Sequence, residues 1–179
     1  ASSTNKSQQK TIKNEINFIG IGLHSGIHAN VKITSDYPNS GITFIRTDLK
    51  ENNTIKALWP NVSATNLSTT ISNGKEASVS TIEHLMSALS GMHIDNARVY
   101  IDGPEVPILD GSSKLFVEFI ERAKIQDQNV PRKIIKVKKE VEVIKGDSFV
   151  RIIPHNQFSI DFEIEFDSLL VNKQFCQLK

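Results

Sequence analysis

The amino-acid sequence predicts an α+β fold with two layers, a sheet and the helices that pack on it, followed by an incomplete second domain of similar type. Three observations support this prediction. Segments in which apolar and polar residues alternate, as in strands with one buried face, occur both early and late in the chain. Two segments with apolar residues at helical spacing lie before residue 125. No helical pattern follows them, so the late strands have no helix of their own.

The first part of the chain contains a polar arm and several strand signals. Residues 1–10 are rich in Ser, Asn, Gln and Lys and are expected to form a flexible arm. A hairpin follows, because two alternating segments flank a turn that is unusually rich in glycine. The remaining predicted segments are the hairpin strands 16–21 and 29–33, their turn 20–26, a strand that begins at Ile42 and a small accessory sheet within 57–72.

Two helices are predicted from apolar stripes. The stronger signal is four apolar residues at i, i+3, i+4 and i+7, namely Ile82, Leu85, Met86 and Leu89. Gly91 ends this helix at the position that a C-cap favours. A strand is predicted over 96–101, and a second helix over 112–124 has its apolar residues on one face. We expect that face to pack on the first helix or on the sheet.

The last part of the chain is predicted to be all strand. The polar segment 126–131 carries little to bury and is interpreted as a linker. Alternation over 135–144, 149–153 and 158–166 then predicts a three-stranded antiparallel meander. Such a sheet is marginal alone, so we expect a partner to cover its apolar face. The predicted organisation is the arm 1–10, a first α+β domain over 11–127 and the first strands of a second domain over 131–179.

Composition narrows the class of protein. The chain has 179 residues, 39% of them hydrophobic, and 21 Lys+Arg against 20 Asp+Glu, a net charge of +1. Bulk charge therefore points neither to nucleic acid nor to an acidic membrane surface. No stretch has the length of a membrane span, and the polar start does not resemble a signal peptide. A single cysteine, Cys176, fits a reducing compartment, so we expect a cytoplasmic protein.

Glu83 and His84 lie in the first turn of the first predicted helix and could carry chemistry. Ser80 and Glu83 also have the spacing of a capping box, in which Glu83 only accepts a hydrogen bond from a backbone N–H. His84 lies about 200° around the helix from Ile82, at ~100° per residue, so it points away from the apolar stripe. It is therefore free to face a cleft or water. A catalytic zinc needs about three protein ligands, so His84 alone does not make a zinc site. From the pattern alone, the structural and the catalytic interpretations both stay open.

Two further polar residues have ordinary interpretations. His24 lies among glycines and could approach a ligand closely, or it could be a solvated turn histidine. The glycines around it do not form a dinucleotide-binding motif, and no helix follows them. Asp110, just before the second predicted helix, is expected to hold the N-terminal turn of that helix.

Six strings of residues, in order and in spacing, are similar to the UDP-3-O-acyl-N-acetylglucosamine deacetylase family. The resemblance covers about residues 12–166. It implies two α+β domains of the ribosomal protein S5 domain 2-like type that stack helix layer against helix layer, with the site between them. The strings are 20–26 (GIGLHSG), 44–48 (FIRTD), 67–70 (LSTT), 80–85 (STIEHL), 94–96 (IDN) and 104–112 (PEVPILDGS).

The resemblance implies a zinc-dependent hydrolase. The family removes acetate from UDP-3-O-acyl-N-acetylglucosamine, a small-molecule substrate, in the committed step toward lipid A in Gram-negative bacteria. Carried over residue by residue, Glu83 matches the general base that takes a proton from the water that Zn²⁺ activates, and His84 matches a zinc ligand. Leu67 matches a residue that lines the substrate cleft, and His24 matches one near the polar part of the site.

Departures from the family pattern limit this prediction. The other two zinc ligands belong to a His-Lys-x-x-Asp pattern in the second domain, which this sequence does not contain, and Ser68 stands where some members have cysteine. We therefore expect a fragment, inactive alone, of a deacetylase that is a monomer at full length. One alternative is a truncated, non-catalytic binding domain. A second is a structural α+β domain in which Glu83 caps the helix and His84 is solvated.

Overall fold

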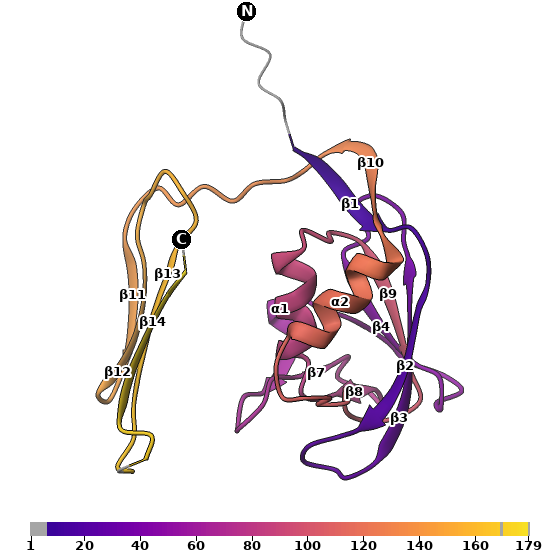
Figure 1. Ribbon diagram of the computed structural model, residues 1–179, viewed down its shortest axis with the longest axis horizontal. Coiled ribbons are helices and arrows are strands. Elements are labelled where there is room, and N and C mark those ends of the chain that lie inside the picture. The colour runs from indigo at the N-terminus through magenta and orange to yellow at the C-terminus, as the bar shows by residue number, and fades with distance from the viewer. Residues whose placement is uncertain (1–6, 169, 179) are drawn as a thin grey trace, which may run out of the picture. The chain divides into compact units, whose positions relative to one another are not determined.

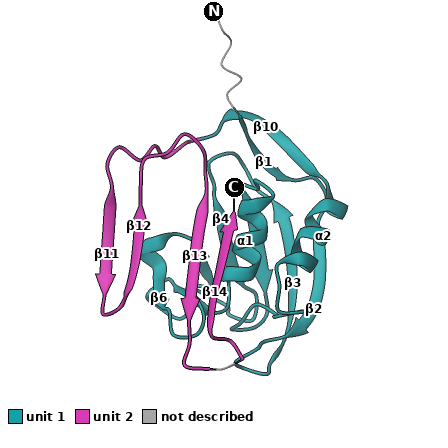
Figure 2. Cartoon of the chain, turned by 60° about the vertical axis from the view of Figure 1, so that its left-hand side comes forward, with its two compact units in different colours: residues 1–132 teal, residues 133–179 magenta. Residues whose placement is uncertain are grey.

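The computed structural model describes residues 7–168 and 170–178. The chain divides into two compact units, residues 1–132 and 133–179 (Figure 2). Unit 1 is α+β, and the strands described in unit 2 form two hairpins. Among the described residues, no helix has the length and apolar character that a membrane crossing requires.

Unit 1 is built on a five-stranded sheet with the strand order β2-β3-β9-β4-β5. Only β4 and β9 are parallel, and the other neighbours pair antiparallel. In β3 the residues Ala29, Val31 and Ile33 are buried and alternate with exposed ones, which confirms the predicted hairpin. The strands are β2 (Ile16–Ile21), β3 (His28–Ser35), β4 (Ile42–Arg46), β5 (Thr54–Lys56) and β9 (Ala97–Ile101).

Both predicted helices are confirmed, as α1 (Glu83–Gly91) and α2 (Lys114–Ala123), and they lie against one face of the sheet (Figure 1). The apolar stripe of α1 is buried through Leu85 and Leu89, and that of α2 through Phe116 and Ile120. Phe18 of β2 meets Phe116 edge to face at 5.7 Å between ring centroids. Burial of these stripes is what keeps the helices in place, because isolated helices of this length are marginal in water.

A small three-stranded sheet, in the order β6-β7-β8, forms the accessory sheet of unit 1. Its strands are β6 (Val62–Ala64), β7 (Thr70–Ser72) and β8 (Ser78–Val79), so it extends further along the chain than the predicted 57–72. The 3-10 helix η1 (Trp59–Asn61) precedes it, because Pro60 favours the first turn of a helix over a strand. The accessory sheet leads directly into α1.

The linker predicted at 126–131 is wrong. This segment lies in strand β10 (Ile125–Pro131), which pairs antiparallel with β1 (Gln8–Ile12). Gln128 links this strand to the rest of unit 1: its Nε2 donates to the Asp36 carbonyl at 2.7 Å and its Oε1 accepts from Asn96 Nδ2 at 2.7 Å. Residues 8–10 of the predicted arm belong to β1, and residues 1–6 lie outside the described part of the chain.

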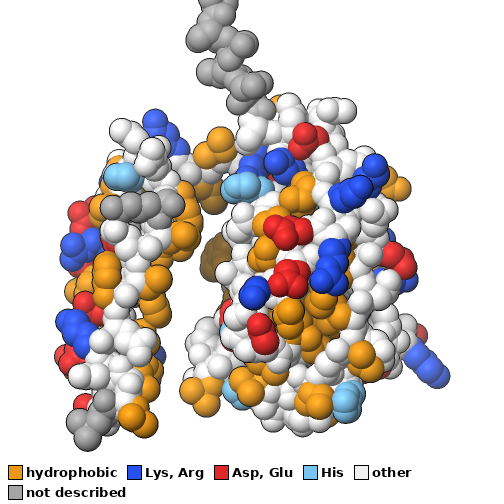
Figure 3. Space-filling view, in the orientation of Figure 1, with side chains coloured by type: hydrophobic (Ala, Val, Ile, Leu, Met, Phe, Trp, Pro, Cys, Tyr) orange, Lys and Arg blue, Asp and Glu red, His pale blue; other side chains and the backbone are white. Residues whose placement is uncertain are grey.

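The three-stranded meander predicted for unit 2 is also wrong. The structure instead has two hairpins, in which β11 (Val141–Lys145) pairs with β12 (Ser148–Ile152) and β13 (Ile160–Glu165) with β14 (Lys173–Leu178). No described residue of unit 2 is buried, and Figure 3 shows hydrophobic side chains along its surface. Exposed examples include Val143, Phe149, Phe162 and Phe175, each more than half accessible.

The difference in burial predicts that the two units differ in independent stability. Residues 1–132, produced alone, should unfold cooperatively in urea as followed by circular dichroism, because all the buried hydrophobic residues of the described chain lie there. Residues 133–179 alone should show no cooperative transition, since two-stranded hairpins without a buried face are marginal in water. A sharp, concentration-independent transition in the second segment would contradict this account.

Candidate active site

The start of α1 is set by an unusual backbone conformation at Thr81. Thr81 has φ 55° and is only 2% exposed. A left-handed conformation costs a non-glycine residue about 1–2 kcal/mol, and a β-branched side chain makes it rarer still. The conformation turns the chain out of β8 and into α1, so that Glu83 becomes the first helical residue and His84 the second.

Glu83 is tied to the turn between β6 and β7. Its Oε2 accepts a hydrogen bond from the Thr69 N–H at 3.0 Å, and the Ile82 N–H donates to the Thr69 carbonyl at 3.3 Å. Among the described residues, no hydrogen bond involves its other oxygen, Oε1. The carboxylate is thus held at one oxygen and leaves the other able to accept a proton.

The capping box expected from Ser80 and Glu83 does not form. The N-cap position of α1 is Ile82, which makes no side-chain capping bond. Ser80 lies two residues earlier and its hydroxyl donates to the Pro104 carbonyl at 3.3 Å. The spacing alone suggested a box, but the left-handed turn at Thr81 moves the helix start past the register that a box requires.

His84 is half-buried and supplies one imidazole. Its carbonyl accepts from the Ser113 hydroxyl at 3.0 Å, which joins α1 to the start of α2, while its ring makes no hydrogen bond within the described residues. No group of three or more His, Cys, Asp or Glu side chains that could hold a metal ion occurs in that part of the chain. This donor set fits one ligand of a zinc site but not a complete site.

Leu67 lies in the β6–β7 turn, two residues before Thr69. It has φ 58° and its side chain is 91% exposed. The left-handed backbone conformation costs a leucine free energy. Because the side chain is exposed, no burial of apolar surface offsets this cost. Trp59, 86% exposed, is a second large apolar residue of the accessory region and was not singled out from the sequence.

Glu105, which the sequence did not identify as a candidate, is a buried carboxylate next to the glycine-rich turn. It is 1% exposed. Its Oε1 accepts from the His24 N–H at 3.0 Å and from the Thr81 hydroxyl at 2.8 Å, and its Oε2 accepts from the Ser25 N–H at 2.7 Å. Sequence reasoning missed it because a glutamate between two prolines has no periodicity or spacing that indicates burial.

The hydrogen bonds keep Glu105 ionised in spite of its burial. Burial raises the pKa of a carboxyl, but here the Ser25 hydroxyl, the backbone N–H groups of His24 and Ser25 and the Thr81 hydroxyl outweigh it and lower the pKa to about 2. Gly22 lies against the same carboxylate, since a Cβ at this position would clash with Glu105 Oε2. Glycine at position 22 therefore lets the turn approach the buried charge.

The side chain of His24 is exposed, and only its backbone N–H takes part in the Glu105 cluster. Hydrogen bonds link the segments of His24 and Leu67 to the segment that carries Glu83 and His84. His24 is joined through Glu105 and Thr81 to the start of α1, and Leu67 lies beside Thr69, which bonds to Glu83. The structure places all four on segments that converge on the N-terminal end of α1.

Other residues from the six strings hold the fold. Arg46 forms an ion pair with Asp48 at 2.6 Å and donates to the Ser78 carbonyl at 2.7 Å, so it joins β4 to the accessory sheet. Asn96 is 1% exposed and its Oδ1 accepts from the Gly41 N–H at 2.9 Å.

Asp110 bonds to the N–H and hydroxyl of Ser112 at 3.0 and 2.9 Å, and these bonds lower its pKa. It shapes the turn before α2 but makes no direct bond to the helix, so its expected hold on the N-terminal turn of α2 passes through Ser112. The Ser112 hydroxyl in turn accepts from the N–H of Lys114, the first helical residue, at 3.1 Å.

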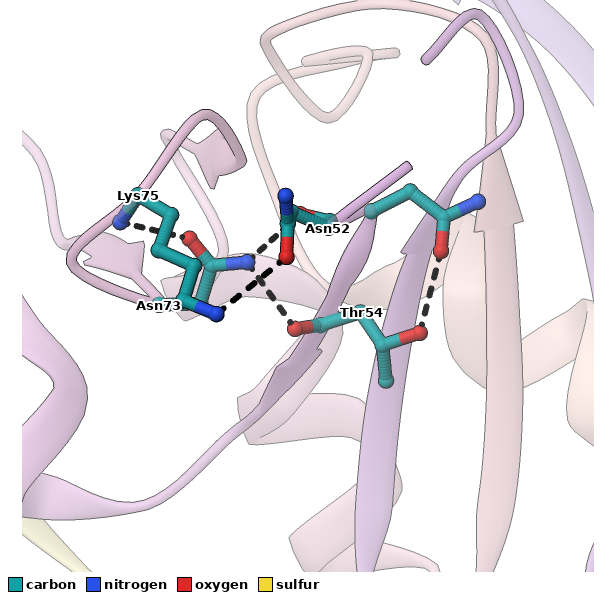
Figure 4. Close-up of a pocket in the computed structure, with 5 residues that line it drawn as sticks. Asn52, Thr54, Asn73 and Lys75 are labelled. Atoms are coloured by element: carbon teal, nitrogen blue, oxygen red, sulfur yellow. Dashed lines mark hydrogen bonds between the residues drawn. The ribbon is translucent and has the colours of Figure 1, made fainter. Parts of the chain in front are cut away.

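Unit 1 also has a polar concavity, which is formed by residues other than the site candidates. It is lined by Asn52, Asn53, Thr54, Asn73 and Lys75 (Figure 4). Its polar groups bond to one another: Asn73 Nδ2 donates to the Asn52 carbonyl at 2.6 Å, and Lys75 Nζ donates to Asn52 Oδ1 at 3.3 Å. None of the four predicted site residues lines it.

Comparison with known proteins places the chain in a family. It matches the model of the family described as UDP-3-O-acyl N-acetylglycosamine deacetylase over residues 9–179, and the chain belongs to this family. A protein of Geobacter sp. (strain M21), named UDP-3-O-acyl-N-acetylglucosamine deacetylase, is 46% identical over 171 residues, which are 96% of this chain and 56% of that protein. A protein of the same name from Methylococcus capsulatus is 43% identical over 166 residues, 93% of this chain and 54% of its own length.

The chain therefore spans about half the length of the curated relatives it matches. The family resemblance seen in the six strings is confirmed. The described residues contain the Glu83–His84 pair but no group of three or more side chains that could hold a metal ion, and a little under half of each relative lies outside the matched region.

The contact between Gly22 and Glu105 gives a test of the buried cluster. Gly22→Ala should lower the free energy of unfolding of residues 1–132 by about 1–3 kcal/mol, because the added methyl group meets a carboxylate that four hydrogen bonds hold in place. Gly91→Ala is the matched control: nothing lies within 4 Å of its added Cβ, and it should be neutral or stabilise by up to about 1 kcal/mol. Urea unfolding of both variants measures the difference, and equal effects would refute the contact.

Proposed function

We propose that this chain is part of a zinc-dependent deacetylase that hydrolyses the acetamide of UDP-3-O-acyl-N-acetylglucosamine. The observation that supports this most strongly is the Glu83–His84 pair at the start of α1, in a chain that matches the deacetylase family over residues 9–179. The relatives that it matches carry that activity in their names. The reaction breaks the amide C–N bond, adds the hydroxyl of water to the acetyl group and leaves acetate and a free amine.

In this proposal Glu83 is the general base. Its Oε2 is fixed by the Thr69 N–H at 3.0 Å, and Oε1 accepts a proton from the attacking water and later releases it toward the leaving nitrogen. Because the carboxylate is anchored at one oxygen, the other is held in one orientation rather than sampling several, which favours proton transfer.

His84 would be one ligand of the metal. Its ring makes no hydrogen bond within the described residues and is free to bind through a neutral nitrogen. Zinc in such a site supplies a Lewis acid that polarises the acetamide carbonyl and makes water more acidic. The remaining ligands would come from the part of the longer relatives that this chain does not include.

Further elements of the proposal concern the substrate and the second domain. Leu67, exposed in the β6–β7 turn, would line the cleft that receives the acyl-sugar, and His24 would lie near its polar part. Unit 2 would begin a second α+β domain, whose missing residues would cover the exposed faces of its two hairpins. Both domains would be of the ribosomal protein S5 domain 2-like type, in a cytoplasmic, monomeric enzyme of lipid A synthesis.

The role of Glu83 can be tested in the enzyme that carries this chain at the full length of its relatives. Glu83→Gln keeps the side-chain size but removes the proton acceptor, so kcat for acetate release from UDP-3-O-acyl-N-acetylglucosamine should fall by about 10²–10⁴-fold. Glu121→Gln makes the same change at an exposed position of α2 and should leave kcat unchanged. If the Glu83→Gln enzyme had the same kcat as the Glu121→Gln control, the assignment of Glu83 as the general base would be wrong.

The 179-residue chain itself should neither bind catalytic zinc tightly nor turn over substrate. Ligand count sets metal affinity, and the described residues contain no group of three or more side chains that could hold a metal ion. Equilibrium dialysis with Zn²⁺, compared between this chain and its His84→Ala variant, should show only weak binding that the variant reduces further. Turnover above a metal-free control would contradict the prediction. If the natural protein had this length and no activity, the alternative of a non-catalytic binding domain would be favoured.

A further inference from the structure

The carboxylate of Glu105 joins the glycine-rich turn to the start of α1. Oε1 is shared by the His24 N–H, at 3.0 Å, and the Thr81 hydroxyl, at 2.8 Å, while Oε2 receives the Ser25 N–H at 2.7 Å. The turn and Thr81 are more than fifty residues apart in the sequence, so a single side chain holds two distant segments at one point.

The backbone around Glu105 adds to this hold. The Ser80 N–H donates to the Pro104 carbonyl at 2.9 Å, and the Val106 N–H donates to the Ser80 carbonyl at 3.1 Å. This bridge fixes residue 80 against residue 105, and the Glu105 side chain then bonds to the next residue, Thr81. The backbone of Thr81 is thereby held in its left-handed conformation, with φ 55°, from both sides.

The backbone conformation of Thr81 affects Glu83, two residues later in the chain, and His84, three residues later. The Ile82 N–H donates to the Thr69 carbonyl at 3.3 Å, and the Thr69 N–H donates to Glu83 Oε2 at 3.0 Å. A rotation at Thr81 toward the common right-handed region would swing the first turn of α1 and break this pair of bonds. His84 follows directly, so the direction of its side chain depends on the same backbone angle.

We propose that Glu105 is a positioning residue, whose buried carboxylate clamps Thr81 against the His24–Ser25 turn and thereby orients Glu83 and His84. This inference rests on the proposed function, because it concerns the same pair of residues. Glu105 takes no part in the chemistry itself: both of its oxygens are used by donors of the protein, and its side chain is 1% exposed.

The clamp requires a carboxylate rather than any polar side chain of this size. Donors approach both oxygens, so both must accept hydrogen bonds. Glutamine has one accepting oxygen and one NH₂ donor, so in either orientation its NH₂ faces a backbone N–H. Glu105→Gln therefore leaves the backbone N–H of either His24 or Ser25 without an acceptor, with almost no change in side-chain volume.

The first experiment uses the 179-residue chain and measures amide hydrogen exchange. In Glu105→Gln, exchange at the N–H groups of Thr69 and Ile82 should become about 10- to 100-fold faster than in the wild type, the loss expected when a buried hydrogen bond is unmade. Neither N–H bonds to Glu105 itself, so a change there reports on the helix start. Unchanged exchange at both positions, after correction for global stability, would overturn the proposal.

Asp36→Asn is the matched control. The Asp36 side chain is 5% exposed and accepts from the Tyr37 N–H at 2.9 Å and from Arg98 Nε at 3.0 Å, just after β3 ends and so at the opposite end of that strand from the His24–Ser25 turn. It makes the same carboxylate-to-amide change at a side chain that is itself nearly inaccessible, although its partner Arg98 is exposed. It should lower global stability while leaving the relative exchange of Thr69 and Ile82 as in the wild type.

The second experiment measures kcat in the enzyme at the full length of its relatives, per folded and zinc-loaded molecule. Glu105→Gln should lower kcat by about 10- to 100-fold with little change in KM, because a small misplacement of a catalytic group reduces rate more than binding. In a Glu83→Gln background the same change should have a smaller effect, because the part of the loss that passes through the orientation of Glu83 is already absent. A full additional loss in that background, or an unchanged kcat in the single variant, would refute the positioning role.

The two experiments separate failure of this inference from failure of the proposed function. If the full-length protein deacetylates no acyl-sugar, the proposed function is wrong, and hydrogen exchange still decides whether Glu105 orients the start of α1. If activity is present and depends on Glu83 but not on Glu105, the proposed function stands and the positioning role is rejected.

Discussion

The Glu105 carboxylate, ionised and almost inaccessible to water, is surrounded by donors from two distant segments of the chain, the His24–Ser25 turn and Thr81. A buried charge is tolerated only when hydrogen bonds replace the water that it has lost, and here backbone N–H groups and hydroxyls do so. Three features are found together with this carboxylate. They are the close approach of Gly22, the left-handed backbone of Thr81 and the start of α1 just after Thr81. In this account, the geometry of the candidate site depends on Glu105, a buried residue that is not itself part of the site.

The five-stranded sheet supplies the rigid base for that cluster. Its central strand β9 pairs with β3 on one side and β4 on the other, and residues 102–106 follow directly from it. Both helices bury their apolar stripes on the sheet, and the Ser113–His84 bond joins their N-terminal ends. A site at helix starts above a packed sheet can hold its side chains more precisely than a site on a free loop.

Unit 2 presents a different physical situation. Its described strands pair in two hairpins, and their apolar residues are accessible to solvent rather than packed. The chain spans about half the length of its relatives, which is consistent with a proposal in which further residues cover these faces and contribute the remaining metal ligands. In that proposal the imidazole of His84 is one member of a set drawn from two parts of a longer chain.

The sequence by itself determined the α+β class, the β2–β3 hairpin, both helices and the family, because apolar periodicity and ordered strings of residues are local signals. It did not determine that 126–131 forms a strand or that residues 135–166 do not form a meander, since pairing of polar strands depends on partners far along the chain. Only the tertiary structure replaced the Ser80–Glu83 capping box with the Thr69–Glu83 bond and revealed Glu105. Burial of a single charge is decided by which distant donors surround it, and no local pattern records that.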